Sequence, residues 1–288
     1  MAATILITGA NGTVGSDLTA ELANQGVKVR AGVRSKLRAR NVMAYEPELV
    51  EMDLTRPDTF ADALYGIEKL FLLTPFTGGT TEIVQSLVDA AKAAGVSHIV
   101  RLSAYGADAD PGITLGRWHR AEEKIVQASG VPSTILRPNG FFQNFAENDV
   151  RSIKTQNAIY SPVEDGKASF VDTRDIAAVA AKALTQPGHE GKIYQITGPE
   201  AISYTQIAEQ LSAITGRTIN FVPVPGEAVR DGMVAGGAPE ILADALVELF
   251  QLYEDGYAAR VLPTVEEITG KPARSFAQYA ADYADVFA

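Results

Sequence analysis

The sequence of 288 residues contains no cysteine and only three histidines. Without cysteine, the chain can form no disulfide, no cysteine-ligated zinc site and no thiol nucleophile. No apolar run approaches the roughly 20 residues that a membrane-spanning helix needs. The nearest run, 176–184, is short and is interrupted by Lys182. The first residues have neither the basic nor the apolar region of a secretory signal. We therefore expect a soluble, cytoplasmic protein that does not engage a membrane.

Basic residues are also fewer than acidic ones. The chain has 25 basic against 35 acidic residues and a net charge of −10. This balance argues against broad binding to nucleic acid or other polyanions. Hydrophobic residues make up 46% and charged residues 21% of the chain, which is typical of a globular protein with a sizeable core.

Short apolar strands alternate with amphipathic helices through the first half of the chain. The pattern predicts strands at 4–8, 27–33, 49–52, 69–73, 98–102 and 133–136, with helices at 14–25, 81–94 and 116–128. Such alternation is typical of a parallel sheet covered by helices on both faces. We therefore expect a Rossmann-type, doubly wound α/β fold.

The pattern becomes irregular after the sixth predicted strand. Strand pieces at 169–171 and 192–196 flank a predicted helix at 173–184. We therefore expect a Rossmann lobe over 1–150, with returns to its sheet at 169–198, and a smaller, mainly helical C-terminal α/β lobe over 199–288. For a predicted helix at 239–253 we favour core packing over a lid above the substrate, with Phe250 undecided.

A glycine-rich loop follows the first predicted strand and opens the first helix: Gly9-Ala10-Asn11-Gly12-Thr13-Val14-Gly15. Glycine permits the tight turn, the close approach of backbone N–H groups to a pyrophosphate, and close packing of helix and strand. The helix start also favours anions. A plain structural turn is the alternative. The strand before the loop and the helix after it favour dinucleotide binding by Gly9, Asn11, Gly12, Thr13 and Val14.

The end of the second strand distinguishes NAD from NADP. Between Glu21 and Glu46 there is no acidic residue, but there are several basic ones: Lys28, Arg30, Arg34, Lys36, Arg38 and Arg40. Arg34 stands where NAD enzymes usually carry an acid that accepts from the ribose 2′-OH. A guanidinium there can bind a 2′-phosphate. We therefore expect NADPH as the cofactor, whereas Arg38 and Arg40 also fit a solvated helix start.

Asp53 follows the third predicted strand and could accept a hydrogen bond from the adenine amino group. An acid at the start of the next helical segment, 57–64, is an equally good interpretation. Asp53 and Leu54 are both assigned to the cofactor site.

Several further segments resemble the NmrA-like, atypical short-chain dehydrogenase/reductase family. These are His98–Ser103, Leu136–Phe145, Phe170–Ala177 and Tyr194–Glu200, beside the glycine loop and Arg34. The family includes type 2 NAD(P)H:quinone oxidoreductases, triphenylmethane reductases and redox-sensing regulators. The resemblance covers nearly the whole chain. It implies a Rossmann lobe that binds NADP, a small C-terminal lobe and a substrate pocket between them.

The resemblance also implies roles for residues that follow the later strands. Thr74, Pro75 and Phe76 would wall the middle of the cofactor, with 77–80 as a flexible lip. Asn139, Gly140 and Phe141 would lie at the nicotinamide, whereas one of Phe141 and Phe142 is expected in the core. We also assign Ser103 and Pro138 to the cofactor site.

The Tyr-x-x-x-Lys pair of ordinary short-chain dehydrogenases is missing. The residue four before Lys124 is Arg120, and Tyr105 has no lysine four residues on. The missing pair puts carbonyl–alcohol interconversion in doubt and weakens the hypothesis of a sugar epimerase or dehydratase. It favours acceptors that need hydride more than a well-placed proton.

His119 could partly replace the missing tyrosine. In the resemblance, this position corresponds to a histidine of the quinone and triphenylmethane reductases. Glu123, four residues on, shares its helix face and could orient the imidazole or raise its pKa. His119 is either the catalytic proton donor or a residue that only lines the site. None of the histidines is paired at metal-ligand spacing, so we expect no metal.

Together these features predict an NADPH-dependent reductase that transfers hydride to a small, planar, apolar acceptor such as a quinone, enone, imine or dye. The alternative is a redox-sensing regulator that binds NADP(H) and acts through a protein partner without turnover. We expect a monomer or homodimer.

Overall fold

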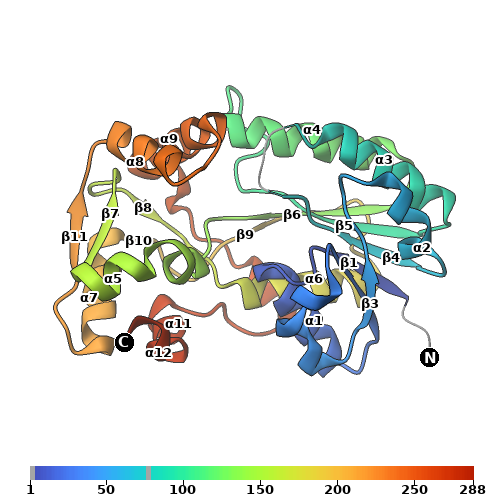
Figure 1. Cartoon of the computed structure of the whole chain (residues 1–288), viewed down its shortest axis with the longest axis horizontal. Helices are drawn as coiled ribbons and strands as arrows, with labels where there is room; N and C mark the ends of the chain where they lie inside the picture. The colour runs from blue at the N-terminus through green and yellow to red at the C-terminus, as the bar shows by residue number, and fades with distance from the viewer. Residues whose placement is uncertain (1–3, 76–78) are drawn as a thin grey trace. The chain divides into compact units, whose positions relative to one another are not determined.

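The computed structural model describes residues 4–75 and 79–288. These residues form two compact units, whose elements are labelled in Figure 1. Unit 1 consists of Met1–Asp108, Gly116–Pro138 and Thr173–Gln195. Unit 2 consists of Ala109–Leu115, Asn139–Asp172 and Ile196–Ala288.

Unit 1 is built on a seven-stranded sheet with the order β3-β2-β1-β4-β5-β6-β9. Its strands are β1 (Ile5–Thr8), β2 (Val29–Val33), β3 (Glu48–Glu51), β4 (Lys69–Leu72), β5 (His98–Leu102), β6 (Ser133–Pro138) and β9 (Ile193–Ile196). The pairs from β3 across to β6 are parallel. The order 3-2-1-4-5-6 is that of the dinucleotide-binding Rossmann fold, which confirms the predicted fold class.

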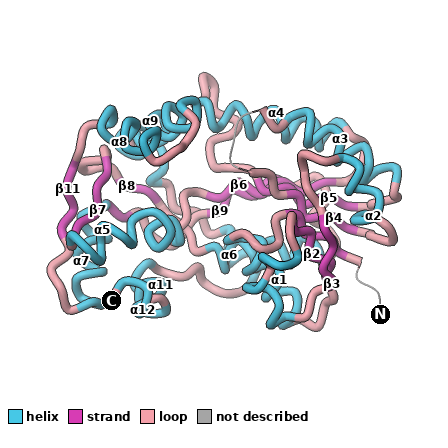
Figure 2. Tube along the Cα trace, viewed as in Figure 1, coloured by secondary structure: helices cyan, strands magenta, loops and turns pink. Residues whose placement is uncertain are grey.

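Helices cover both faces of this sheet, as Figures 1 and 2 show. They are α1 (Thr13–Asn24), α2 (Phe60–Leu64), α3 (Thr81–Ala93), α4 (Thr114–Ala128) and α6 (Thr173–Thr185), with short 3₁₀ turns η1 (Lys36–Arg38), η2 (Arg40–Tyr45) and η3 (Pro57–Thr59). Helices α1 and α6 pack together on one face. On the other face, residues of α2, α3 and α4 share a core with strand residues such as Leu6, Leu70 and Ile99.

Unit 2 combines two small sheets with short helices. Strands β7 (Ala158–Ser161) and β11 (Asn220–Pro223) pair in parallel, and β8 (Lys167–Ala168) and β10 (Ile202–Ser203) pair antiparallel. The helices are α5 (Val150–Gln156), α7 (Tyr204–Thr215), α8 (Gly226–Ala235), α9 (Glu240–Glu254), α10 (Thr264–Thr269), α11 (Phe276–Asp282) and α12 (Ala284–Phe287), with a π turn η4 (Phe145–Asp149) and a 3₁₀ turn η5 (Tyr257–Ala259). Aromatic rings dominate their common core.

The unit boundaries differ from the predicted ones. The chain leaves unit 1 after Pro138, not at residue 150, and only Thr173–Gln195 returns to it. The Asn139 side chain explains the early exit, because its amide nitrogen donates to Ser169 Oγ and to the Ala258 carbonyl, both 2.9 Å away within unit 2. The predicted strand at 169–171 is reduced to one bridge between Phe141 and Val171.

Among the described residues, no helix combines the length and apolar character that crossing a lipid bilayer would require.

Candidate cofactor site and its buried ion pairs

The predicted cofactor residues of unit 1 follow the carboxyl ends of successive strands. The glycine loop follows β1, Arg34 follows β2, Asp53 and Leu54 follow β3, Thr74 and Pro75 follow β4, and Ser103 follows β5. Because these strands are parallel, all of these residues lie at one edge of the sheet. This is the edge at which doubly wound sheets bind their ligands. Phe76, and with it 77–78 of the predicted lip, lies outside the described residues.

Backbone geometry explains the glycines of the loop. Gly9 has a φ of 61°, in the left-handed region that favours glycine. A Cβ on Gly15 would lie 2.2 Å from the Gly9 carbonyl oxygen, so only glycine lets α1 start this close to β1. Gly12 is the N-cap of α1, and the helix has neither a side-chain cap nor an acidic residue in its first turn. Its N-terminal N–H groups are therefore suited to an anion.

Two predicted residues come together at the ends of β2 and β3. Arg34 is exposed directly after β2, and its charge helps to lower the pKa of the Asp53 carboxyl. Arg30, by contrast, is taken up by the fold, because it pairs with Glu48 at 2.8 Å and donates to the Ala63 and Tyr65 carbonyls. Arg34 is thus available at the cofactor edge, whereas Arg30 is structural.

Asp53 is engaged in a local turn. Its Oδ1 accepts from the Thr55 backbone N–H at 2.9 Å and from the Thr55 hydroxyl at 2.8 Å. These hydrogen bonds are the main reason that its pKa is lowered. The structural alternative for Asp53 is therefore realised as a turn, not as a cap of 57–64, whose N-cap residue is Arg56. A contact between Asp53 and adenine stays a prediction.

A carboxylate on α4 connects two neighbouring segments of unit 1. Glu122 is 3% exposed, and its Oε2 accepts from the Thr74 hydroxyl at 3.1 Å and from the Arg101 guanidinium. Its Oε1 accepts from the Thr80 hydroxyl. Arg101 itself is 1% exposed and also donates to the Thr74 hydroxyl at 3.0 Å. Glu122 and Arg101 therefore form a buried ion pair.

The neighbouring carboxylate, Glu123, is held by a second set of donors. It accepts from Arg137 Nε at 2.8 Å and Nη2 at 2.7 Å, and from Arg120 at 3.0 Å. The Ser103 hydroxyl donates to it at 2.6 Å. Burial by itself would raise the pKa of Glu123, but these donors lower it. Ser103 thus serves Glu123, and any contact of its hydroxyl with a cofactor remains a prediction.

Arg101 and Arg137 were not singled out from the sequence. The available signal was a basic residue inside an otherwise apolar run, as in His98–Leu102. Such a charge is buried only with a partner. Glu122 and Glu123 prove to be those partners, although Glu123 was expected to pair with His119.

His119 lies on the same helix and is largely neutral at neutral pH. Burial lowers the pKa of its imidazole to about 4, and the nearby positive charge of Arg101 acts in the same direction. Glu122 and Glu123 act the opposite way but do not compensate. Glu123 does act to raise the pKa of His119, as expected, but burial outweighs this effect and the net pKa is lowered.

In unit 2, the segment after β6 divides into core and surface residues. Asn139 is buried, with its Oδ1 accepting from the Gly140 N–H at 2.9 Å, which makes its amide structural. A Cβ on Gly140 would lie 2.5 Å from the Tyr253 hydroxyl. Phe142 is fully buried and packs edge-to-face on Phe276 at 5.2 Å. Phe141 is only half-buried, and its contact with the nicotinamide stays a prediction.

Helix α9 contributes to the core of unit 2. Tyr253 is part of the buried cluster, and Leu249 and Phe250 pack against it, which fits the core interpretation of the predicted helix at 239–253. Ile241, at the start of α9, is 57% exposed.

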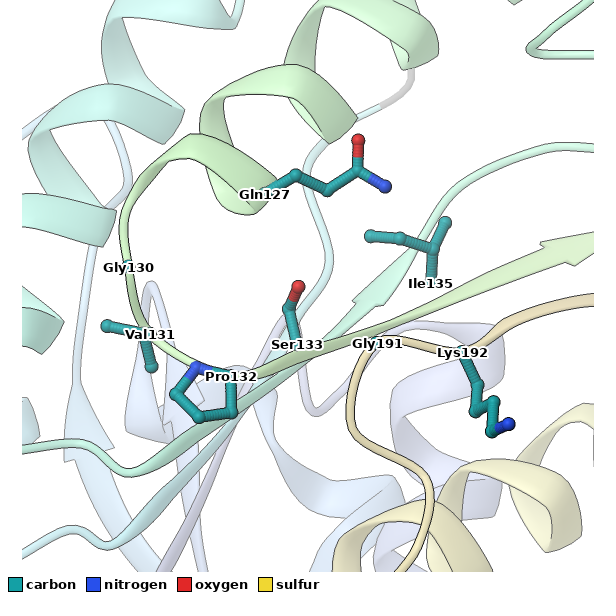
Figure 3. A pocket seen from close by; sticks show the side chains of 8 residues that line it. All are labelled: Gln127, Gly130, Val131, Pro132, Ser133, Ile135, Gly191 and Lys192. Atoms are coloured by element: carbon teal, nitrogen blue, oxygen red, sulfur yellow. The ribbon is translucent and has the colours of Figure 1, made fainter.

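A surface depression of about 400 Å³ lies elsewhere in unit 1. Figure 3 shows the residues that line it. Its lining includes Gln127 near the end of α4, Ser133 at the start of β6, and Lys192 just before β9. Since Ser133 is the first residue of β6, the depression is at the amino end of that strand, at the edge of the sheet opposite Gly9 and Arg34. It is therefore separate from the cofactor site.

Comparisons with known proteins establish the family of the chain. The model of the NmrA-like family matches residues 1–280. The NAD(P)H azoreductase of Xenophilus azovorans is 39% identical over 283 residues, 98% of this chain and 99% of the relative. The (4-alkanoyl-5-oxo-2,5-dihydrofuran-3-yl)methyl phosphate reductase of Streptomyces griseus is 37% identical over 99% of both chains.

Among solved structures, the NADPH-dependent quinone oxidoreductase of Escherichia coli in complex with NADPH superimposes with a TM-score of 0.84. It is 27% identical, and the match covers 96% of this chain and 99% of that one. Fold, glycine loop and full-length similarity all agree: the chain belongs to the NmrA-like family.

Proposed function

We propose that this protein is a reductase that transfers hydride from NADPH to a small, conjugated, planar acceptor such as a quinone, enone, imine or dye. The broader statement, an NAD(P)H-dependent oxidoreductase, follows from the family and from full-length relatives that are named as NAD(P)H-linked reductases. The nature of the acceptor is the finer part of the proposal.

The observation that carries the proposal is the set of groups at the carboxyl edge of the sheet. The uncapped start of α1 suits the pyrophosphate, because its N–H groups and helix dipole favour an anion. The exposed Arg34 suits a 2′-phosphate, which a guanidinium can bind with two parallel hydrogen bonds. The same edge has no acid immediately after β2 that would repel this phosphate.

The residues of unit 1 also bear on the proton that must accompany hydride. NADPH would supply the hydride. Because the pKa of His119 is lowered to about 4, its imidazole at pH 7 is neutral and can donate only a hydrogen bond. Water is then the proton source for the product anion, and His119 lines the site. This favours acceptors whose reduced form tolerates a transient negative charge, as quinones do, or that become neutral on accepting hydride and need no proton, as cationic dyes do.

The test is an assay of NADPH oxidation with a panel of quinones, enones, imines and cationic or azo dyes. Turnover of at least one conjugated acceptor, with simple aldehydes and ketones much slower, is the expected result. Tight NADPH binding without turnover of any acceptor would overturn the enzyme proposal and favour a redox-sensing regulator. In that case, a pull-down with and without NADPH should recover a partner in a redox-dependent manner.

A further inference from the structure

Hydroxyl groups at both ends of the connection between β4 and α3 donate to the same carboxylate. Thr74 lies two residues after β4, and Thr80 is the N-cap of α3. Both donate to Glu122, the first to Oε2 and the second to Oε1. One side chain of α4 therefore holds both ends of this connection.

The bond from Thr80 replaces a common stabilising interaction. A threonine at an N-cap usually accepts a hydrogen bond from the second or third backbone N–H of its helix. Thr80 makes no such bond, and its hydroxyl donates to Glu122 instead. The start of α3 is thus fixed to α4 at the expense of its own cap, which a purely local role in helix stability would not require.

The charge of Arg101 is also committed to this arrangement. Its guanidinium reaches Glu122, Thr74 and the Leu72 carbonyl, the last at 3.3 Å. Its Nε, in contrast, has no hydrogen-bond partner among the described residues. The guanidinium of Arg101 is therefore oriented toward the end of β4, although this orientation leaves its Nε without a hydrogen-bond partner among the described residues.

The end of β4 lies beside the glycine loop. Strand β4 pairs with β1, and a Cβ on Gly9 would lie 3.1 Å from the Leu73 side chain, one residue before Thr74. The Thr8 hydroxyl, at the end of β1, donates to the Leu73 carbonyl at 2.8 Å. The residue just before Thr74 is thus held against the place where the pyrophosphate is proposed to bind.

We propose that Glu122 is a positioning residue for the cofactor: by holding Thr74 and Thr80 on one carboxylate, it fixes the residues directly after β4, next to the glycine loop, to the start of α3. It acts through these threonines and through α4, the helix that carries His119. The proposal rests on the proposed function, because it assumes that NADPH binds at this edge. Small displacements of groups that position a ligand have large effects on binding and reactivity.

The proposal is tested through Thr80 because Glu122→Gln would leave Arg101 buried without a counter-charge and could prevent folding. Thr80→Val removes the hydroxyl, keeps the shape and leaves the Glu122–Arg101 pair intact. Binding of NADPH is measured by energy transfer from Trp118, the only tryptophan of the chain, to the reduced nicotinamide. We expect the Kd of Thr80→Val for NADPH to rise about three- to tenfold. Thr80→Ser, which restores the hydroxyl, should bind as the wild type does.

A matched control separates positioning from general stability. Thr134 is fully buried in the same unit, and its hydroxyl contacts His98 at 2.9 Å and donates to the His189 carbonyl at 2.6 Å. Thr134→Val should lower the melting temperature at least as much as Thr80→Val while leaving the Kd for NADPH unchanged.

An unchanged Kd in Thr80→Val, or an equal loss of affinity in Thr134→Val, would overturn the positioning role while the proposed function stands. Wild-type protein that does not bind NADPH would overturn both. In a turnover assay with an acceptor that the wild type reduces, Thr80→Val should raise KM for NADPH and leave kcat at saturation nearly unchanged.

Discussion

The guanidinium of Arg137 faces the carboxylate of Glu123 inside unit 1 and donates two hydrogen bonds to it, at 2.8 Å from Nε and 2.7 Å from Nη2. Arg137 is 2% exposed and Glu123 is fully buried. Asp108 adds a second carboxylate 2.5 Å from Arg137 Nη1. A pair of this kind is costly to break from one side, because the remaining charge stays in the interior.

Arg137→Met should therefore lower the free energy of unfolding by about 3–5 kcal/mol. The double variant Glu123→Leu/Arg137→Met should lose less than the sum of the two single variants, because it leaves no unpaired charge of the pair. Urea denaturation of the wild type, both single variants and the double variant measures this coupling. Additive losses would show that the two side chains stabilise the fold independently.

The ionisation of His119 gives a second prediction. Its folded pKa of about 4 lies below the ordinary 6.5, so the folded state binds fewer protons than the unfolded state between these values. The lowered pKa therefore makes the free energy of unfolding depend on pH: the contribution of the neutral His119 to stability is fully present above pH 6.5 and is lost as the pH falls toward 4. His119→Gln should therefore show a flatter loss of melting temperature over this range, and the His119 resonance in NMR should not titrate between pH 6 and 8.

Turnover tests the same assignment. If His119 only lines the site, His119→Gln should keep the rate within about tenfold of the wild type, whereas loss of a true proton donor typically costs 10²–10⁴-fold. His189→Gln, which changes a histidine at the opposite edge of the sheet, is the control. A loss of several hundredfold confined to His119→Gln would make His119 the proton donor.

How far the sequence predicts this fold depends on the element. The strand predicted at 98–102 matches β5 residue for residue, because an apolar β run stands between a turn and a loop. Strand β6 extends through Arg137 and Pro138, beyond the predicted end at 136. The predicted strand stopped early because Arg-Pro is typical of a strand end. The pair of β7 and β11 was not predicted, since two short segments so far apart in sequence give no local signal of pairing.

The site was predictable where backbone conformation or strand order dictates it. The glycine at 9 follows from a positive φ, and the position of Arg34 follows from the end of β2. The partners of Glu122 and Glu123 were not predictable. Which of two adjacent glutamates meets Arg101 and which meets Arg137 depends on how α4 is rotated over β5 and β6, and only tertiary packing fixes that rotation.

The ionisation of Asp149 in unit 2 should make the folded state less stable as the pH rises toward 8. Burial raises the pKa of its carboxyl from 3.8 to about 7, so the folded state holds a proton that the unfolded state releases. Its stabilising effect is complete below pH 3.8 and is lost as the pH rises through 7. Asp149→Asn, which stays neutral, should be more stable than the wild type at pH 8 by about 1–4 kcal/mol, with little difference at pH 4.

Chemical denaturation at the two pH values measures this difference. Asp165→Asn, which neutralises an exposed acid of the same unit, is the control and should leave the pH dependence as it is. A stability difference for Asp149→Asn that is equal at pH 4 and pH 8 would show that the Asp149 carboxyl is not protonated preferentially in the folded state.

The proposed preference for NADPH over NADH depends on Arg34, which is exposed after β2 beside Asp53. Arg34→Glu replaces the guanidinium by a charge that repels a 2′-phosphate, while Arg38→Glu makes the same change of charge a few residues away in an exposed 3₁₀ turn. The variant at Arg34 should lose NADPH affinity, whereas its affinity for NADH should fall little or not at all. The variant at Arg38 should change both affinities only slightly.

The most direct measurement is the ratio of the Kd for NADH to the Kd for NADPH, determined for the wild type and for Arg34→Glu by energy transfer from Trp118. The account predicts a wild-type ratio well above one and a decrease of about 10–100-fold in the variant, as expected for the loss of a charge-assisted pair and its replacement by repulsion. An unchanged ratio in Arg34→Glu would contradict the proposal that the cofactor's 2′-phosphate rests on this residue.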